Sequence, residues 1–266
     1  NSSDNIMLLC CRKKTENVLL LDKNHLDDEI QKIEYSFSFA LNLLVALKYK
    51  VRNNRIYPNE KKYQIFVFCL KSITNAMCFY KLLTVDITHV NKYMTRLEND
   101  FLTLSDILYS SSFMIGFTIM FILDIVHKNN NVSLILRIQT IHRQIGLSEG
   151  YQNFIIWNWI YIVVIIGANV IVNIMYYVSY SNPCVIDLII DNITDIFVMA
   201  SDVHVVIAAR IITLLTKYLD EWIKEILMMN DEQGNDKRYS KLIEIYEYIL
   251  KTYNLYKKIF QAVVSL

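Results

Sequence analysis

The chain has 266 residues, of which 54% are hydrophobic and 20% are charged, and it carries a formal net charge of +1. With a mean hydropathy of +0.27, this composition is typical of a polytopic membrane protein, and the balanced charge gives no electrostatic reason to expect a nucleic-acid partner. Only five glycines and two prolines occur, which favours a few long helices and argues against glycine-rich phosphate loops. We therefore expect an all-α, polytopic membrane helical bundle.

The five cysteines give no sign of a metal site. Their spacing matches no metal-binding pattern, and three of them lie in or beside apolar segments, so free thiols are expected. Cys10 and Cys11 precede the basic residues Arg12, Lys13 and Lys14, a context that suits palmitoylation, but an unmodified pair is the favoured interpretation.

Residues 1–62 are expected to form a cytoplasmic amino-terminal region. Residues 1–34 mix charges without a clear period, so we expect them to be poorly ordered or loosely helical. The apolar stretch 35–47 is about half as long as a membrane span, and we expect it to lie on the membrane or to pack against the bundle. A basic connector follows over 48–62, where Pro58 interrupts any helix.

Four apolar segments between residues 63 and 216 are predicted to span the membrane. They cover 63–85, 105–126, 154–180 and 185–216. Lys71 lies deep in the first segment and therefore needs a partner. Between the second and third segments, apolar residues recur every three to four positions over 132–145. This period predicts an amphipathic helix that lies on the membrane surface or extends a span.

Acidic residues mark one face of the fourth span. Asp187, Asp191, Asp195 and Asp202 fall within roughly 80° of that helix face. The opposite face carries Ile189, Ile193, Ile196, Ile207, Ile211 and Leu214. A carboxylate at the centre of a bilayer costs on the order of 3 kcal/mol, so the acids are expected to face water, a partner helix or a ligand. The isoleucine face is the one that suits lipid.

The fourth span is predicted to continue without a break beyond residue 216. Residues 217–229 are amphipathic and rich in helix formers, so one long helix is expected to leave the membrane. A loop over 231–235 and an amphipathic helix over 239–260 follow, which makes 217–266 a cytoplasmic helical region. Lysine and arginine are concentrated in the connectors 48–62 and 127–153 and in this region, which places the amino terminus and residues 217–266 on the cytoplasmic side of the plasma membrane.

Polar residues also share one face of the third span. These residues are Asn158, Asn169, Asn173, Tyr176 and Tyr180. A tight turn over 181–183 makes the third and fourth spans antiparallel neighbours, so their polar faces are expected to converge near the outer surface. The predicted small-molecule site comprises Asp187, Asp191, Asp195, Asn169, Asn173, Tyr176 and Tyr180. The alternative is that these side chains only hydrogen-bond to neighbouring helices.

No catalytic motif was identified in the sequence. It contains no Walker loop, no dinucleotide-binding glycine pattern, no HExxH and no CxxC, and the histidines are scattered. We therefore expect neither an enzyme nor a bound metal or cofactor. Two glycosylation patterns begin at Asn131 and Asn192, but the first is expected in the cytosol and the second in the membrane, so neither is expected to be used.

Four stretches, in this order and spacing, resemble the insect gustatory receptor family. They are LKYKVRNNRIYPNEKKY at 47–63, NVSLILRIQTIHR at 131–143, ARIITLLTKYLDEW at 209–222 and ILKTYNLYKKIFQ at 249–261. The resemblance implies a seven-helix subunit of a tetrameric ligand-gated cation channel that detects bitter, sugar and other small-molecule tastants. It also implies an outer ligand cavity and a pore on the last helix, so we expect this chain to be a fragment that stops before a fifth span.

The partners implied by the resemblance are a small-molecule tastant, membrane lipid and other receptor subunits in a homo- or heterotetramer. Two alternatives remain open from the residues themselves. One is a solute or ion transporter that uses the intramembrane acids as a proton or cation relay, although such proteins usually show inverted repeats and broken helices. The other is a structural membrane protein whose acidic stripe packs against Lys71.

Overall fold

The computed structural model describes residues 24–84, 104, 108, 111–112, 115–116, 118–145, 151–179, 185–229 and 236–264. These parts are mostly helical, so the all-α fold class is confirmed. The helices are α2 (Asp28–Leu43), α3 (Lys61–Thr84), α5 (Lys128–Ile145), α6 (Tyr151–Ser179), α7 (Val185–Met229) and α8 (Asp236–Val264). A hairpin of strands β1 (Tyr49–Arg52) and β2 (Arg55–Pro58) connects α2 to α3, and residues 118–126 form a further helical segment before α5.

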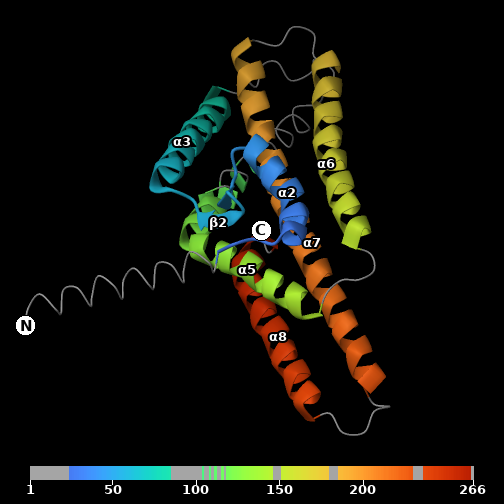
Figure 1. Ribbon diagram of the computed structural model, residues 1–266. Coiled ribbons are helices and arrows are strands. Elements are labelled where there is room, and N and C mark those ends of the chain that lie inside the picture. The colour runs from blue at the N-terminus through green and yellow to red at the C-terminus, as the bar shows by residue number, and fades with distance from the viewer. Residues whose placement is uncertain are drawn as a thin grey trace, which may run out of the picture.

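Helix α7 runs through most of the length of the molecule (Figure 1). Helix α6 lies beside one half of α7, and α8 lies beside the other half. Helix α2 packs against α6 and α7, while α5 contacts both α7 and α8. The single 45-residue helix confirms the prediction that the fourth apolar segment continues without a break, and α8 confirms the helix predicted after it.

Helix α2 begins earlier than the sequence indicated, since residues from Asp28 onward are regularly helical rather than loosely ordered. Asp27 is extended, and acidic residues occupy the first turn, where the positive end of the helix dipole stabilises them. Ile30, Ile33 and Phe37 share one face and are each about 1% exposed. The apolar stretch therefore packs against the bundle, which was one of its two predicted placements.

The hairpin was not predicted, because the connector appeared only basic and interrupted by proline. Its antiparallel register pairs Tyr49 with Pro58 and Arg52 with Arg55. Asn53 and Asn54 form the turn with positive φ angles of 53° and 56°, the conformation that two-residue hairpin turns require and that asparagine tolerates. Ile56 is fully buried, which fixes the hairpin against the core.

Two stretches of the described residues are long and apolar enough to cross a membrane. They are 151–175 in α6, with a mean hydropathy of 2.2, and 199–228 in α7, with a mean hydropathy of 1.5. Helix α3 forms over the first predicted span, as expected, but it is not one of these two stretches. The second predicted span is described only in part. A bundle of four spans therefore stays a prediction.

The amphipathic helix predicted between the second and third spans is α5, but its apolar face points into the molecule. Val132, Ile135, Ile138 and Ile141 are buried in the core, where α5 contacts α7 and α8. Only residue 127 separates α5 from the helical residues 118–126, and the backbone N–H groups of His127 and Asn131 donate to the residues four positions earlier, so α5 extends that segment, which was one of its two predicted placements. Its burial in the protein core was not predicted. The period of the sequence shows that one face is apolar but not what covers it.

Candidate functional site

The structure describes the predicted ligand site only in part. Asn169 donates a hydrogen bond to the carbonyl oxygen of Ile165 in its own helix, at 3.0 Å, and Asn173 and Asp195 are half-buried. The side chains of Asp187, Asp191 and Tyr176, and the whole of Tyr180, lie outside the described residues. Helices α6 and α7 are neighbours, as predicted, but the convergence of their polar faces into a cup stays a prediction.

The face of α7 opposite the acids is covered differently from the expectation in the part that is described. Asp202 is exposed, whereas Ile207, Ile211 and Leu214 on the opposite face are each less than 5% exposed. The prediction that this end of the isoleucine face meets lipid is therefore wrong. The reason is that α2, α5 and α8 pack around α7, so its apolar face forms protein core here.

One member of the polar face of α6 holds the two long helices together. Asn158 is fully buried, and its Oδ1 accepts a hydrogen bond from Nε of Arg210 in α7 at 2.7 Å. Arg210 also donates to the carbonyl oxygen of Phe154 at 3.2 Å and lies 4.0 Å from the centroid of the Phe154 ring. For Asn158, the alternative of an interhelical hydrogen bond is confirmed. Arg210 was not singled out, although a lone charge in an apolar helix was the signal.

The four stretches that carry the family resemblance pack together in one region. Tyr218, from 209–222, hydrogen-bonds His142, from 131–143, at 3.0 Å. Lys48, from 47–63, places its ammonium 4.3 Å from the ring centroid of Phe260, from 249–261. Helix α8 contacts both α5 and α7, and α5 contacts the hairpin. We call this region, made of the hairpin, α5, α8 and the second half of α7, the junction layer.

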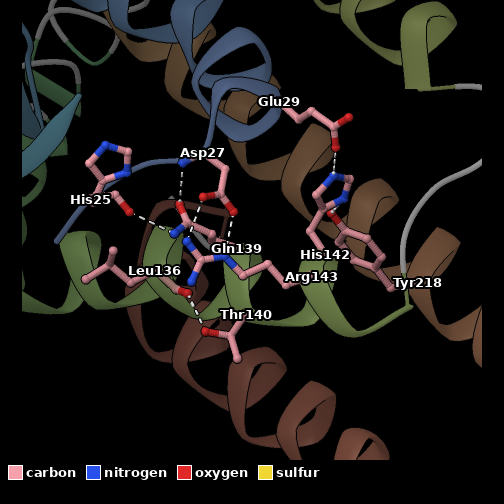
Figure 2. A network of polar contacts seen from close by, with 9 residues as sticks. All are labelled: His25, Asp27, Glu29, Leu136, Gln139, Thr140, His142, Arg143 and Tyr218. Carbon is pink, nitrogen blue, oxygen red and sulfur yellow. Dashed lines mark hydrogen bonds and ion pairs between the residues drawn. The ribbon is translucent and has the colours of Figure 1, made fainter. Parts of the chain in front are cut away.

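A polar network joins the start of α2 to α5 within the junction layer (Figure 2). Arg143 donates two hydrogen bonds to the carboxylate of Asp27, each at 2.6 Å. Gln139 accepts from the backbone N–H of Asp27 at 3.1 Å and donates to the carbonyl oxygen of His25 at 2.8 Å. The hydrogen bond from Arg143 lowers the pKa of Asp27, and the same bond raises the pKa of Arg143.

The second half of this network, also seen in Figure 2, runs through a buried histidine. His142 Nε2 lies 2.5 Å from the carboxylate of Glu29, and its Nδ1 lies 3.0 Å from the hydroxyl of Tyr218. A carboxylate only accepts, so Nε2 carries a proton, and in the neutral ring Nδ1 accepts from Tyr218. Tyr151 donates to the carbonyl oxygen of Glu29. The network therefore ties α2, α5, α6 and α7 together.

A buried lysine forms an ion pair with the segment that precedes α5. Lys48, which is 6% exposed, lies 3.9 Å from the carboxylate of Asp124 in the helical segment 118–126. Burial lowers the pKa of Lys48, and Asp124 opposes that shift. Lys71 lies 4.9 Å from the ring centroid of Phe121 in the same segment. The partner that Lys71 needs is thus supplied by the helical segment 118–126 through Phe121.

A carboxyl group is also buried beneath α2. Glu34 accepts a hydrogen bond from the hydroxyl of Tyr49 on strand β1, and both side chains are buried. Burial raises the pKa of Glu34 to about 7, and the Tyr49 hydrogen bond opposes that shift. Burial and the neighbouring carboxylate raise the pKa of Tyr49 far above its ordinary value. This pair is one contact that holds the hairpin on α2.

The polar contacts described above attach helices and the hairpin to one another. Within the described part of the chain, no cluster of three or more His, Cys, Asp or Glu side chains is placed to hold a metal ion. Comparison with known proteins gives no match to a protein-family model, a curated protein or a solved structure.

Proposed function

We propose that this chain is part of a gustatory chemoreceptor subunit, a ligand-gated cation channel of the plasma membrane that detects small-molecule tastants. The observation that carries the proposal is the packing of the four family-resembling stretches into the junction layer. They are separated by up to about 200 positions in the sequence, yet they contact one another. A shared set of contacts is what a family-specific structural unit requires, whereas unrelated chance similarities have no reason to meet.

The exposed apolar surface of α6 supports a membrane location. In the stretch 151–175 only 11% of the residues in the most apolar window are buried. Val163, Val164, Ile171 and Val172 are each about 60% exposed. The core helix of a soluble protein would bury such residues, and a contiguous surface of this kind is otherwise a lipid or protein interface. We propose that it faces lipid, with the amino terminus and the junction layer in the cytoplasm.

The exposure of Asp202 supports assembly with other subunits. Asp202 lies within the apolar stretch 199–228 of α7, next to the exposed Val205. A carboxylate in a membrane helix requires water or a polar partner, because contact with acyl chains is expensive. We propose that this face of α7 meets another receptor subunit or a water-filled path in a homo- or heterotetramer.

The ligand is proposed to bind between the outer halves of α6 and α7. The support is the pattern of acids, amides and phenols in the sequence together with the neighbouring positions of the two helices. A transporter is the weaker candidate, because the described stretches of α6 and α7 run for 29 and 45 residues without the interruptions that transporters use to bind ions.

The test uses the intact receptor that contains this chain, expressed in oocytes and challenged with a panel of sugars and bitter alkaloids. The proposal predicts a cation current, with a dose–response curve that Asp191→Asn shifts at unchanged surface expression. Asp202→Asn should leave the apparent affinity unchanged. An intact receptor that reaches the surface and gives no current with the panel would contradict the proposed activity. If the dose–response curve is unshifted in both Asp191→Asn and Asn173→Ala, the proposed ligand site is contradicted, but the proposed channel activity is not.

A further inference from the structure

A groove runs between the first turns of α3 and the helical segment 118–126. Its volume is about 360 Å³, and its wall includes Ile65, Phe68, Phe121 and Ile125. The rings of Phe68 and Phe121 lie 5.8 Å apart between their centroids and join the two sides. Ile65 is 63% exposed and Phe68 is 56% exposed, so the parts of the chain that the structure describes leave their apolar surface uncovered.

Two lysines lie at the same end of this groove. Lys61 begins α3, and Lys128 begins α5 one residue after the segment 118–126. The contacts Asn75–Thr118 and Phe68–Phe121 show that α3 and this segment are antiparallel. Phe68 and Phe121 are each seven positions from the nearer lysine, a distance of about 10 Å along a helix. The groove therefore has a cationic end and an apolar wall that extends away from it.

The nearby carboxylates do not neutralise this cationic end. Glu60 pairs with Lys50 at 3.3 Å, and Asp124 pairs with Lys48 at 3.9 Å. Among the described residues, neither Lys61 nor Lys128 takes part in an ion pair. An anionic group placed between the two ammonium groups would therefore gain two partners without displacing an existing one.

We propose that this groove binds one anionic phospholipid from the cytoplasmic leaflet. The phosphate lies between Lys61 and Lys128, and one acyl chain follows Ile65, Phe68, Phe121 and Ile125. The occupant is assigned by its chemistry, because an amphiphile with a negative head and a long apolar tail complements both parts of the groove. The inference rests on the membrane location proposed above, which puts the start of α3 at the cytoplasmic boundary of the bilayer.

The test measures binding of a fluorescent phosphatidylglycerol, labelled on its acyl chain, to the purified full chain in detergent micelles. Unlabelled dioleoyl-phosphatidylglycerol should compete, whereas dioleoyl-phosphatidylcholine should not. The double variant Lys61→Gln/Lys128→Gln should bind roughly tenfold more weakly, because the attraction between each lysine and the anionic headgroup contributes to the affinity. Ile65→Trp, which fills the groove, should weaken binding without changing the charge.

The matched control is Lys241→Gln/Lys257→Gln, which removes two exposed lysines of α8 and should leave the affinity unchanged. If this control variant binds the lipid as weakly as Lys61→Gln/Lys128→Gln, the lipid binds to basic surfaces in general and not to the groove. Unchanged binding in both groove variants, or equal competition by phosphatidylcholine, would overturn the proposal. Extraction of the membranes at alkaline pH distinguishes the two proposals. If the chain stays in the membrane and the groove variants bind lipid as wild type does, only the lipid site is contradicted. If alkaline extraction releases the chain, the membrane location is contradicted.

Discussion

Helices α6 and α7 are both long and apolar enough to cross a membrane, but they bury very different shares of their surface. In the most apolar part of α6 only 11% of the residues are buried, whereas in the most apolar part of α7 50% of the residues are buried. The buried side chains described on α6 are Phe154, Asn158 and Ile162, which follow one another at intervals of four residues. Helix α7 is surrounded by α2, α3, α5, α6 and α8.

This difference shows that hydropathy finds a long apolar helix but does not say what covers it. The apolar side chains of α7 are used as protein core, together with polar groups such as Arg210 and Tyr218 that find partners inside the protein. Most apolar side chains described on α6 are exposed and suit lipid. The attachment of α6 to α7 and the junction layer around α7 are therefore the places where substitutions should have the largest effects.

The largest loss is expected from Arg210→Met. This change leaves the buried amide of Asn158 and the carbonyl of Phe154 without their donor, which should lower the free energy of unfolding by about 4 kcal/mol. The double variant Asn158→Leu/Arg210→Met removes both partners and should recover much of the loss. Thermal unfolding in detergent micelles measures both. Equal losses in the single and double variants would show that the contact does not hold α6 on α7.

The next largest effect is a stabilisation by Glu34→Gln at pH 8. The folded-state pKa of about 7 lies above the ordinary value of 4.5, so the folded protein holds this proton more tightly than the unfolded chain does. Stability should therefore fall as the pH rises from about 4.5 to 7, by about 3 kcal/mol in total. Glu34→Gln should remove that slope, raise the melting temperature at pH 8 and leave it unchanged at pH 4. Parallel pH profiles in the two proteins would contradict the burial of a titrating carboxyl.

A smaller loss is expected from Tyr218→Phe in the junction layer. The change leaves Nδ1 of the buried His142 without its donor, which should destabilise the protein by about 1.5 kcal/mol. Tyr253→Phe, on an exposed position of α8, is the matched control and should change the melting temperature very little. If Tyr253→Phe lowers the melting temperature as much as Tyr218→Phe, the hydrogen bond between Tyr218 and His142 does not account for the loss.

The smallest effect is expected from Asp27→Asn, because Arg143 is 56% exposed in this ion pair. The loss near neutral pH should be about 0.5 to 1 kcal/mol. The pKa of Asp27 is lowered in the folded protein, so its contribution is present above about pH 3.8 and is lost as the pH falls through the lower folded-state value. Wild type and Asp27→Asn should therefore converge in stability toward pH 2. A constant difference down to that pH would show that the charge on Asp27 is not involved.

The elements with strong local signals were predictable from the sequence, but their environment was not. The 3.6-residue period over 132–145 predicted α5, and the apolar run from 185 predicted α7, because these patterns are local. What covers α5 depends on α8, which is about a hundred positions away, and no local pattern carries that information. The Asn53–Asn54 turn signal was present, but a basic connector with a proline concealed the hairpin.

For the residues of the candidate site, too, local patterns were predictable from the sequence and long-range contacts were not. Asn158 belonged to a predicted polar face, because asparagines spaced along an apolar helix are visible in the sequence. The contact between Asn158 and Arg210 was not predictable from the sequence, because the two residues lie 52 positions apart. The same holds for the ion pair between Lys48 and Asp124, which lie 76 positions apart. The outward direction of Asp202 followed from the packing of α2, α5 and α8 around α7, which a helical projection does not contain.

The topology proposed for this chain has α6 and the first half of α7 crossing the plasma membrane, with the junction layer in the cytoplasm. Cysteine labelling of intact cells with a membrane-impermeant maleimide tests it most directly, in a background without the five native cysteines. We expect Asn91→Cys, between the first two predicted spans, to be labelled from outside, and Arg52→Cys, at an exposed position of the hairpin, to be labelled only after the cells are permeabilised. Labelling of Arg52→Cys in intact cells would contradict this topology.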